Sequence, residues 1–158
     1  MKIGVPKEIK NNEYRVGLTP NSVRELVKNN HEVYIQKDAG SEIGFSNSEY
    51  KEAGALIVHT ASELYESSEL IVKVKEPIPE EFHYLNNKHT VFAYLHLAGD
   101  PKTGLDLART GVTGIALETV TADDGSMPLL SPMSSIAGQL SIVVGSYQLL
   151  KPNRGMGT

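Results

Sequence analysis

The stretch ELIVKVKEP, residues 69–77, decides the fold that the sequence predicts. Apolar residues lead into an alternation of Val and Lys, and Pro77, which has no N–H group to donate, then ends the run. This pattern is typical of a buried strand that becomes polar on one face where it reaches the edge of a sheet. Because Lys73 and Lys75 are two residues apart, simple alternation predicts that they point to the same side.

A second apolar run, TVFAYL at residues 90–95, predicts another strand and is followed directly by His96. Parallel neighbouring strands lie about 4.8 Å apart. We therefore expect Lys75 and His96 to meet at one edge of the sheet. Ligands of open α/β sheets bind at the carboxyl ends of the strands, so the sequence predicts a ligand site around these two basic side chains.

Short strand-like runs alternate with short helical segments along the rest of the chain. Further strands are predicted at residues 2–5, 31–36, 55–58 and 112–117. Helical segments are predicted from Pro20 and at residues 46–53, 61–65, 79–85 and 101–109, with Thr19, Ser46 or Asn47, and Asp100 as caps. This order predicts an α/β fold with a doubly wound, mostly parallel sheet, Rossmann-like or flavodoxin-like, and right-handed crossovers.

The last predicted element is a long helix. Its apolar residues recur at spacings of three and four: Met133, Ile136, Leu140, Val143, Tyr147 and Leu150. Ser131 or Ser134 is predicted to cap this helix, and Pro152 follows its end. We expect one domain over residues 1–130, and a linking helix with the start of a linker over residues 131–158. Because the glycine-rich end stops in mid-loop, we expect a cut chain.

Composition favours a globular domain of the cytoplasm. The chain has 158 residues, a formal net charge of −4 and no cysteine. Without a basic stripe, a nucleic-acid partner is not expected, and without cysteine a disulfide framework and a thiolate nucleophile are excluded. The charged start, broken by Pro6, is unlike a signal peptide, and no apolar run approaches the roughly 20 residues of a membrane span.

Arg15 lies in the loop after the first predicted strand and is expected at the same edge as Lys75 and His96. Arg can bind a carboxylate with two hydrogen bonds, Lys supplies a point charge, and His exchanges protons near neutral pH. A 2-oxo acid suits all three, with its carboxylate on Arg15 and its carbonyl group on Lys75 and His96. Taken singly, each side chain could equally be a surface or half-buried group, and Glu118 is interpreted as a structural partner of one of the cations.

No G-x-G-x-x-G motif follows a predicted strand. The pair Gly155 and Gly157 follows a helix and leads into no second element. The sheet is therefore predicted to hold a substrate without a means of holding the pyrophosphate of a dinucleotide.

Several motifs resemble those of the alanine dehydrogenases. They are KIGVPKE at residues 2–8, NNEYRV at 11–16, KVKEP at 73–77, YLHLA at 94–98, LETV at 117–120 and PLLSPMS at 128–134. The related transhydrogenase subunits share the opening motif but lack the Lys75 and His96 signatures. The resemblance covers nearly the whole chain.

The resemblance implies reversible, NAD-dependent oxidative deamination of L-alanine to pyruvate and ammonia. It implies that Arg15 and Lys75 bind the substrate, that His96 donates and accepts the proton, and that Ser134 contacts NAD. It also implies a homo-oligomer, a hexamer in the family, and no metal. We therefore predict Lys75 and His96 as the catalytic pair.

Two departures from the family pattern stand out. Ser135 and Gln139 replace an acidic residue and an Arg, which bears on the domain interface and the cofactor side. Family members also continue into a Rossmann domain that carries the dinucleotide motif, and then return to complete the first domain.

Two hypotheses stay open: the substrate domain of an alanine dehydrogenase, inactive alone, or a non-catalytic or transhydrogenase-like module that binds an oxo acid or a protein through its last helix.

Overall fold

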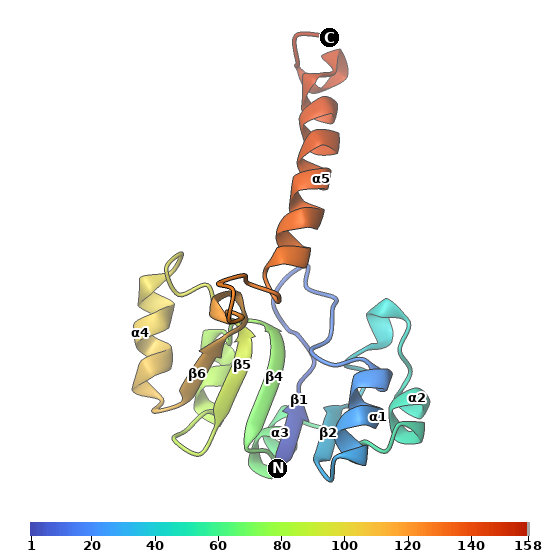
Figure 1. Ribbon diagram of the computed structural model, residues 1–158, viewed down its shortest axis with the longest axis vertical. Helices are drawn as coiled ribbons and strands as arrows, with labels where there is room; N and C mark the ends of the chain where they lie inside the picture. Colours follow the sequence, from blue (N-terminus) through green and yellow to red (C-terminus); the bar gives the residue numbers. More distant parts are fainter. Residues whose placement is uncertain (158) are drawn as a thin grey trace. The chain divides into compact units, whose positions relative to one another are not determined.

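The computed structural model describes residues 1–157, and these divide into two compact units, Met1–Leu117 and the residues from Glu118 onward. The first unit is a six-stranded sheet with helices on both faces (Figure 1). Its strands are β1 (Lys2–Val5), β2 (Glu32–Gln36), β3 (Leu56–Val58), β4 (Leu70–Lys75), β5 (Thr90–Tyr94) and β6 (Thr113–Ala116). Its helices are α1 (Pro20–Lys28), α2 (Asn47–Glu52), α3 (Ala61–Ser67), α4 (Pro101–Arg109) and the 3₁₀ helices η1 (Ser41–Ile43) and η2 (Pro79–Tyr84).

The strand order is β3-β2-β1-β4-β5-β6, and all neighbouring strands run parallel. This confirms the predicted doubly wound α/β sheet. The chain winds outward from β1 to β3 in one direction and from β4 to β6 in the other. The order reverses between β1 and β4, and such a switch point is where an open α/β sheet leaves a crevice for ligands.

Each face of the sheet has its own apolar core. One core joins α1 and α2 to the sheet through Val23 and Tyr50, which have no exposed surface. The other joins α3 and α4 to the sheet through Leu64 and Leu107. Because both faces are buried, the strands of this sheet can be apolar almost throughout.

The local signals for the helix starts are confirmed. The side chains of Thr19, Ser46 and Asp100 accept the N–H groups of Ser22, Glu49 and Thr103, and so cap α1, α2 and α4. In β1, a Cβ atom at Gly4 would collide with the side chain of Ser68 at the end of α3. Only glycine allows α3 to lie so close to that strand.

The register between β4 and β5 shifts before Lys75. Val72 pairs with Phe92, but Lys75 pairs with Tyr94, so β4 has one residue more than β5 over this interval. Such a bulge breaks the alternation of side chains. The prediction that Lys73 and Lys75 point to the same side is therefore wrong: the Lys73 side chain is 1% exposed, and that of Lys75 is 30% exposed.

The second unit contains η3, which starts at Leu117 (Leu117–Thr119), the long helix α5 (Ser131–Leu149) and η4 (Lys151–Asn153). The predicted long helix is confirmed, but its caps are not. Ser131 is already the first helical residue, and Leu130 stands at the cap position without a side-chain hydrogen bond. Within residues 1–157, no helix has the length and apolar character to cross a membrane.

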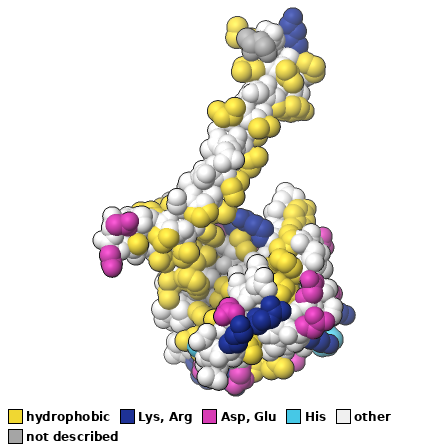
Figure 2. Space-filling view, turned by 45° about the vertical axis from the view of Figure 1, so that its right-hand side comes forward, with side chains coloured by type: hydrophobic (Ala, Val, Ile, Leu, Met, Phe, Trp, Pro, Cys, Tyr) yellow, Lys and Arg dark blue, Asp and Glu magenta, His cyan; other side chains and the backbone are white. Residues whose placement is uncertain are grey.

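The apolar residues of α5 are not confined to the predicted seam. Ile136, Leu140, Val143, Tyr147 and Leu150 from the seam are 46–64% exposed, and Ile142, Val144 and Leu149 outside it are 48–71% exposed. Figure 2 shows hydrophobic side chains along the length of the helix. The 19 residues of α5 include no charged side chain. Charge repulsion therefore does not prevent the exposed apolar surface of α5 from packing against another apolar surface.

We expect the 158-residue chain to self-associate through α5. Burying one such apolar side chain is worth about 1.5–3 kcal/mol, and Val143, Val144 and Gly145 are weak helix formers that favour association over an isolated helix. Sedimentation velocity should therefore show oligomers that Leu140→Lys with Val143→Lys shifts toward monomer.

The matched control is Ser141→Lys with Gln148→Lys, which adds the same charge at two polar positions of α5 outside the predicted seam and should leave the oligomers in place. A wild-type chain that is monomeric at tens of micromolar, with α5 protected from hydrogen exchange, would contradict this prediction.

Candidate active site

Charged side chains gather at the carboxyl ends of β1 and β4, the two strands that flank the switch point. The loop after β1 carries Glu8, Glu13 and Arg15, and β4 ends at Lys75. The prediction that Arg15 and Lys75 share one edge of the sheet requires β1 and β4 to be parallel neighbours, and the strand pairing shows that they are.

Arg15 is held by the carboxylate of Glu13, two residues earlier. Arg15 Nε donates to Glu13 Oε1 at 2.8 Å, and Arg15 Nη2 donates to Glu13 Oε2 at 2.6 Å. This two-point contact raises the pKa of Arg15 and, because the same hydrogen bonds stabilise the charged carboxylate, lowers the pKa of Glu13. The Arg15 side chain is 44% exposed, so it is oriented by Glu13 and still reachable from solvent.

Lys75 lies beside a second carboxylate, that of Glu76. The Lys75 Nζ atom is 3.8 Å from Glu76 Oε2, and Lys10 Nζ forms an ion pair with Glu76 Oε1. Burial by itself raises the pKa of Glu76, but the hydrogen bond from Lys10 and the charges of both lysines outweigh it, so the pKa is lowered. Glu76 is therefore a carboxylate shared by two ammonium groups.

Arg15 and Lys75 both lower the pKa of Glu13. After the hydrogen bonds from Arg15, the positive charge of Lys75 adds to the lowering of the pKa of Glu13. Tyr94, the partner of Lys75 in the pairing of β4 with β5, contributes to the raised pKa of Arg15. Both cations therefore act on Glu13, Arg15 through hydrogen bonds and Lys75 through its positive charge.

His96 follows the end of β5 by two residues and is exposed. Its backbone has a φ of 47°, in the left-handed region, and its carbonyl oxygen accepts the N–H group of Gly99 at 2.9 Å. This tight turn carries the imidazole at the carboxyl end of β5, next to the strand that ends in Lys75. The strained backbone is typical of residues at functional sites.

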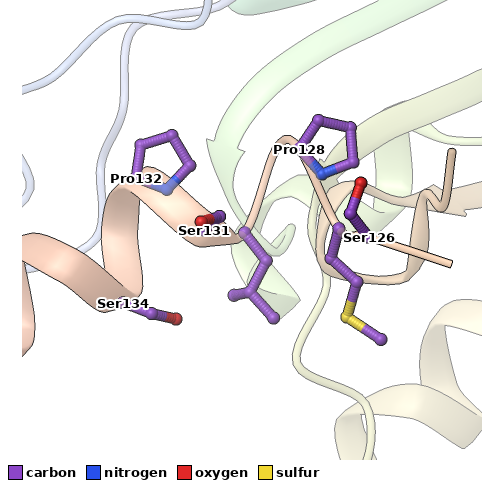
Figure 3. Close-up of a pocket in the computed structure, with 7 residues that line it drawn as sticks. Ser126, Pro128, Ser131, Pro132 and Ser134 are labelled. Carbon is purple, nitrogen blue, oxygen red and sulfur yellow. The ribbon is translucent and has the colours of Figure 1, made fainter. Parts of the chain in front are cut away.

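Ser134, the predicted NAD contact, lies in the second unit in the first turn of α5. It lines an open pocket of about 520 Å³ together with Ser126, Pro128, Ser131, Pro132 and two apolar side chains. Figure 3 shows the three serine hydroxyl groups and the two proline rings around this pocket. The pocket thus offers polar groups beside the amino end of a long helix, where the helix dipole is positive.

The site also contains residues that the sequence reading did not single out. Glu13, Glu76 and Glu8 each contact a cation of the site or its backbone. Their signal was present in the motifs NNEYR, KVKEP and PKE, where a Glu stands close to each basic residue. Among residues 1–157, no group of three His, Cys, Asp or Glu side chains could hold a metal ion.

Fold and site define the class of this protein as a doubly wound α/β domain whose charged side chains flank the switch point of the sheet. Within that class, the chain belongs to the family described as "Alanine dehydrogenase/PNT, N-terminal domain", whose model matches residues 4–137. This confirms the resemblance drawn from the motifs.

The chain is similar to alanine dehydrogenases over nearly its whole length. It is 50% identical to that of Staphylococcus haemolyticus and 46% identical to that of Bacillus subtilis, each time over 157 residues and 99% of this chain. It covers 42% and 41% of those two proteins, so it spans about two fifths of their length.

Solved structures show the same likeness. An L-alanine dehydrogenase superposes with a TM-score of 0.88 at 48% identity, covering 99% of this chain and 43% of that one. A transhydrogenase from Sinorhizobium meliloti gives a TM-score of 0.80 at 25% identity, covering 94% of this chain and 45% of that one. The higher identity lies with the alanine dehydrogenase, as the motifs at Lys75 and His96 predicted.

The ion pair of Glu13 with Arg15 predicts a pH dependence of stability. The pKa of Glu13 is lowered from its ordinary value of 4.5, so its contribution to the free energy of unfolding is complete above about pH 4.5. It is lost as the pH falls through the lowered folded-state pKa. Urea unfolding at several pH values should show that Glu13→Gln is less stable than wild type at pH 7, and that this difference shrinks on acidification.

Arg15→Gln is the matched variant, because it removes the cause of the shift and should give the same convergence at low pH. A stability difference that stays constant between pH 7 and pH 3 would contradict the assignment.

Proposed function

We propose that this chain supplies the substrate-binding part of an NAD-dependent alanine dehydrogenase. That enzyme converts L-alanine, water and NAD⁺ into pyruvate, ammonium, NADH and a proton, and catalyses the reverse reaction. The observation that carries the proposal is that Arg15, held by two hydrogen bonds from Glu13 in the loop after β1, and Lys75, at the end of β4, flank the switch point of the sheet. The family membership and the similarity to complete alanine dehydrogenases support it.

Each cation has a distinct role in this proposal. Arg15, already oriented by Glu13, binds the carboxylate that alanine and pyruvate share, because a planar guanidinium group can bond a carboxylate with two parallel hydrogen bonds. Lys75 donates to the oxygen on the second carbon of pyruvate and stabilises the negative charge that forms there. His96 takes up or returns the proton at that oxygen, since imidazole changes its charge near neutral pH.

The pocket at the start of α5 fits part of a dinucleotide. Its hydroxyl groups from Ser126, Ser131 and Ser134 can hydrogen-bond to polar groups of NAD, and the amino end of α5 favours negative charge. When bound, NAD⁺ would supply the acceptor for the hydride that leaves alanine. The role of this chain is then to hold the substrate at Arg15 and Lys75 while His96 moves the proton.

We also propose that the enzyme is a homo-oligomer in the cytoplasm. The absence of cysteine fits a reducing compartment, and the exposed apolar surface of α5 is suited to burial in an assembly.

The 158-residue chain alone should bind pyruvate without catalysing its reduction. Within residues 1–157, no glycine-rich loop joins a strand to a helix in the way that holds a dinucleotide pyrophosphate. Hydride transfer requires the reacting atoms within about 3.5 Å of each other. NADH oxidation with pyruvate and ammonium should therefore equal a blank without protein, and clear turnover would disprove this prediction.

Two substitutions separate the proposed roles of Arg15 and His96 in an active enzyme built on this domain. Arg15→Ala should raise the KM for pyruvate, because a lost charge-assisted hydrogen bond costs about 1.5–3 kcal/mol. His96→Ala should lower kcat by roughly two to four decades, the usual contribution of a general acid–base.

Steady-state kinetics with pyruvate as the varied substrate distinguishes the two effects. The control is His59→Ala, an exposed histidine in the first unit that lies outside the site, which should change neither constant. If His96→Ala left kcat intact, His96 would have no role in proton transfer.

A further inference from the structure

The bulge before Lys75 leaves the backbone of β4 without its regular partners. Three residue steps in β4, from Val72 to Lys75, oppose two steps in β5, from Phe92 to Tyr94. The extra residue of a bulge is unpaired, and its N–H group needs another acceptor. In this sheet the need arises directly before Lys75, the residue proposed to bind the substrate.

The side chain of Glu8 provides this acceptor. Its Oε1 atom accepts the N–H group of Val74 at 2.7 Å and that of Lys75 at 3.4 Å. Its Oε2 atom accepts a hydrogen bond from Lys73 Nζ at 3.0 Å. The Glu8 side chain is only 3% exposed, so water competes little for these contacts, and one carboxylate engages three consecutive residues of β4.

A second carboxylate, that of Glu81, also binds Lys73, so that Glu8, Lys73 and Glu81 form one buried charge cluster. Lys73 Nζ also donates to Glu81 Oε1 at 2.8 Å, and the Tyr65 hydroxyl group donates to the same oxygen at 2.9 Å. The other oxygen, Glu81 Oε2, accepts the N–H group of Ile78 at 3.0 Å. Lys73 is thus fixed from two sides and cannot turn toward the site in place of Lys75.

We propose that Glu8 is a positioning residue for substrate binding: by accepting the N–H groups of the bulge, its carboxylate fixes the backbone from which Lys75 reaches the substrate. Lys73 neutralises the charge of Glu8 and holds that carboxylate in place. Glu8 also acts on Arg15, the other cation proposed to bind the substrate. The hydrogen bond to Glu13 is the main cause of the raised pKa of Arg15, and the negative charge of Glu8 adds to it. This inference rests on the proposed function, in which Lys75 and Arg15 bind the 2-oxo acid.

The test must separate positioning by hydrogen bonds from simple neutralisation of Lys73. A background with Lys73→Met and Glu81→Gln removes the buried charges that Glu8 would otherwise balance, with side chains of similar volume. In that background, Glu8→Gln keeps an oxygen that can accept the N–H groups of Val74 and Lys75. Glu8→Leu fills the same space without any acceptor, so the two variants differ in the hydrogen bonds and not in charge.

Pyruvate is the probe, and its Kd for the 158-residue chain is measured by NMR titration. The triple variant with Glu8→Gln should bind pyruvate within about threefold of the wild-type chain, whereas the triple variant with Glu8→Leu should bind at least tenfold more weakly, as when Lys75 loses its hydrogen bond to the substrate. Amide exchange at Val74 should be slow in the first and fast in the second.

Stability alone is controlled by Val23→Ala, a core substitution in α1 that destabilises the fold but should leave the pyruvate Kd unchanged. If the triple variants do not fold, the single variant Glu8→Gln in the wild-type chain serves instead, and it should keep slow exchange at Val74 with pyruvate binding within about threefold.

Three outcomes decide the matter. Weaker binding by Glu8→Leu alone supports the positioning role, and equal pyruvate affinity of the Glu8→Gln and Glu8→Leu variants overturns it. If only the single variant Glu8→Gln can be studied, pyruvate binding more than tenfold weaker than in the wild-type chain, with exchange at Val74 still slow, also overturns the positioning role. Lys75→Met tests the proposed function separately: if it does not weaken pyruvate binding, that function fails, whatever the Glu8 variants show.

Discussion

The first unit depends on one buried charge cluster, in which the Lys73 ammonium group lies between the carboxylates of Glu8 and Glu81 at 3.0 and 2.8 Å. These three side chains are 1–5% exposed. A charge so far from water is tolerated only when it is paired, and removing one partner of such a pair costs about 3–5 kcal/mol. Because Glu8 comes from the loop after β1 and Glu81 from η2, the cluster fixes both segments to β4.

The same cluster determines where the basic side chains of the site can lie. It removes Lys73 from the carboxyl edge of the sheet and leaves Lys75 there, beyond the bulge. Arg15 and Lys75 each have their own carboxylate neighbour, Glu13 and Glu76, at distances of 2.6 and 3.8 Å. These pairs are partly exposed and therefore individually weak. The carboxylate of the proposed substrate would thus compete for cations that are already oriented.

The second unit follows a different physical rule. Helix α5 has no charged residue, and its exposed apolar side chains are not limited to one face. A helix of this composition gains most of its stability from packing and little from intrinsic propensity, since Val143, Val144 and Gly145 favour other conformations. Its function as a linker or as an interface is therefore decided by what covers it. The serine-lined pocket at its first turn is the polar exception.

Much of the fold could be predicted from local patterns. The caps at Thr19, Ser46 and Asp100, the apolar strands and their alternation with helices depend on neighbouring residues, which any reader of the chain can see. The parallel pairing of the Lys75 strand with the strand before His96 followed from the same alternation. Motifs around Arg15, Lys75 and His96 likewise predicted the family, because they lie within short, continuous stretches.

Other features depended on residues far apart in the chain. Simple alternation placed Lys73 beside Lys75, but a bulge lies between Val72 and Lys75, and Glu8, more than sixty positions earlier, accepts the N–H groups of Val74 and Lys75 there. No local pattern reports such a contact. The sequence by itself therefore determined the order of elements and the residue types of the site. Only the tertiary structure decided which lysine is buried and which is presented, because burial and pairing of a charge depend on what the fold brings around it.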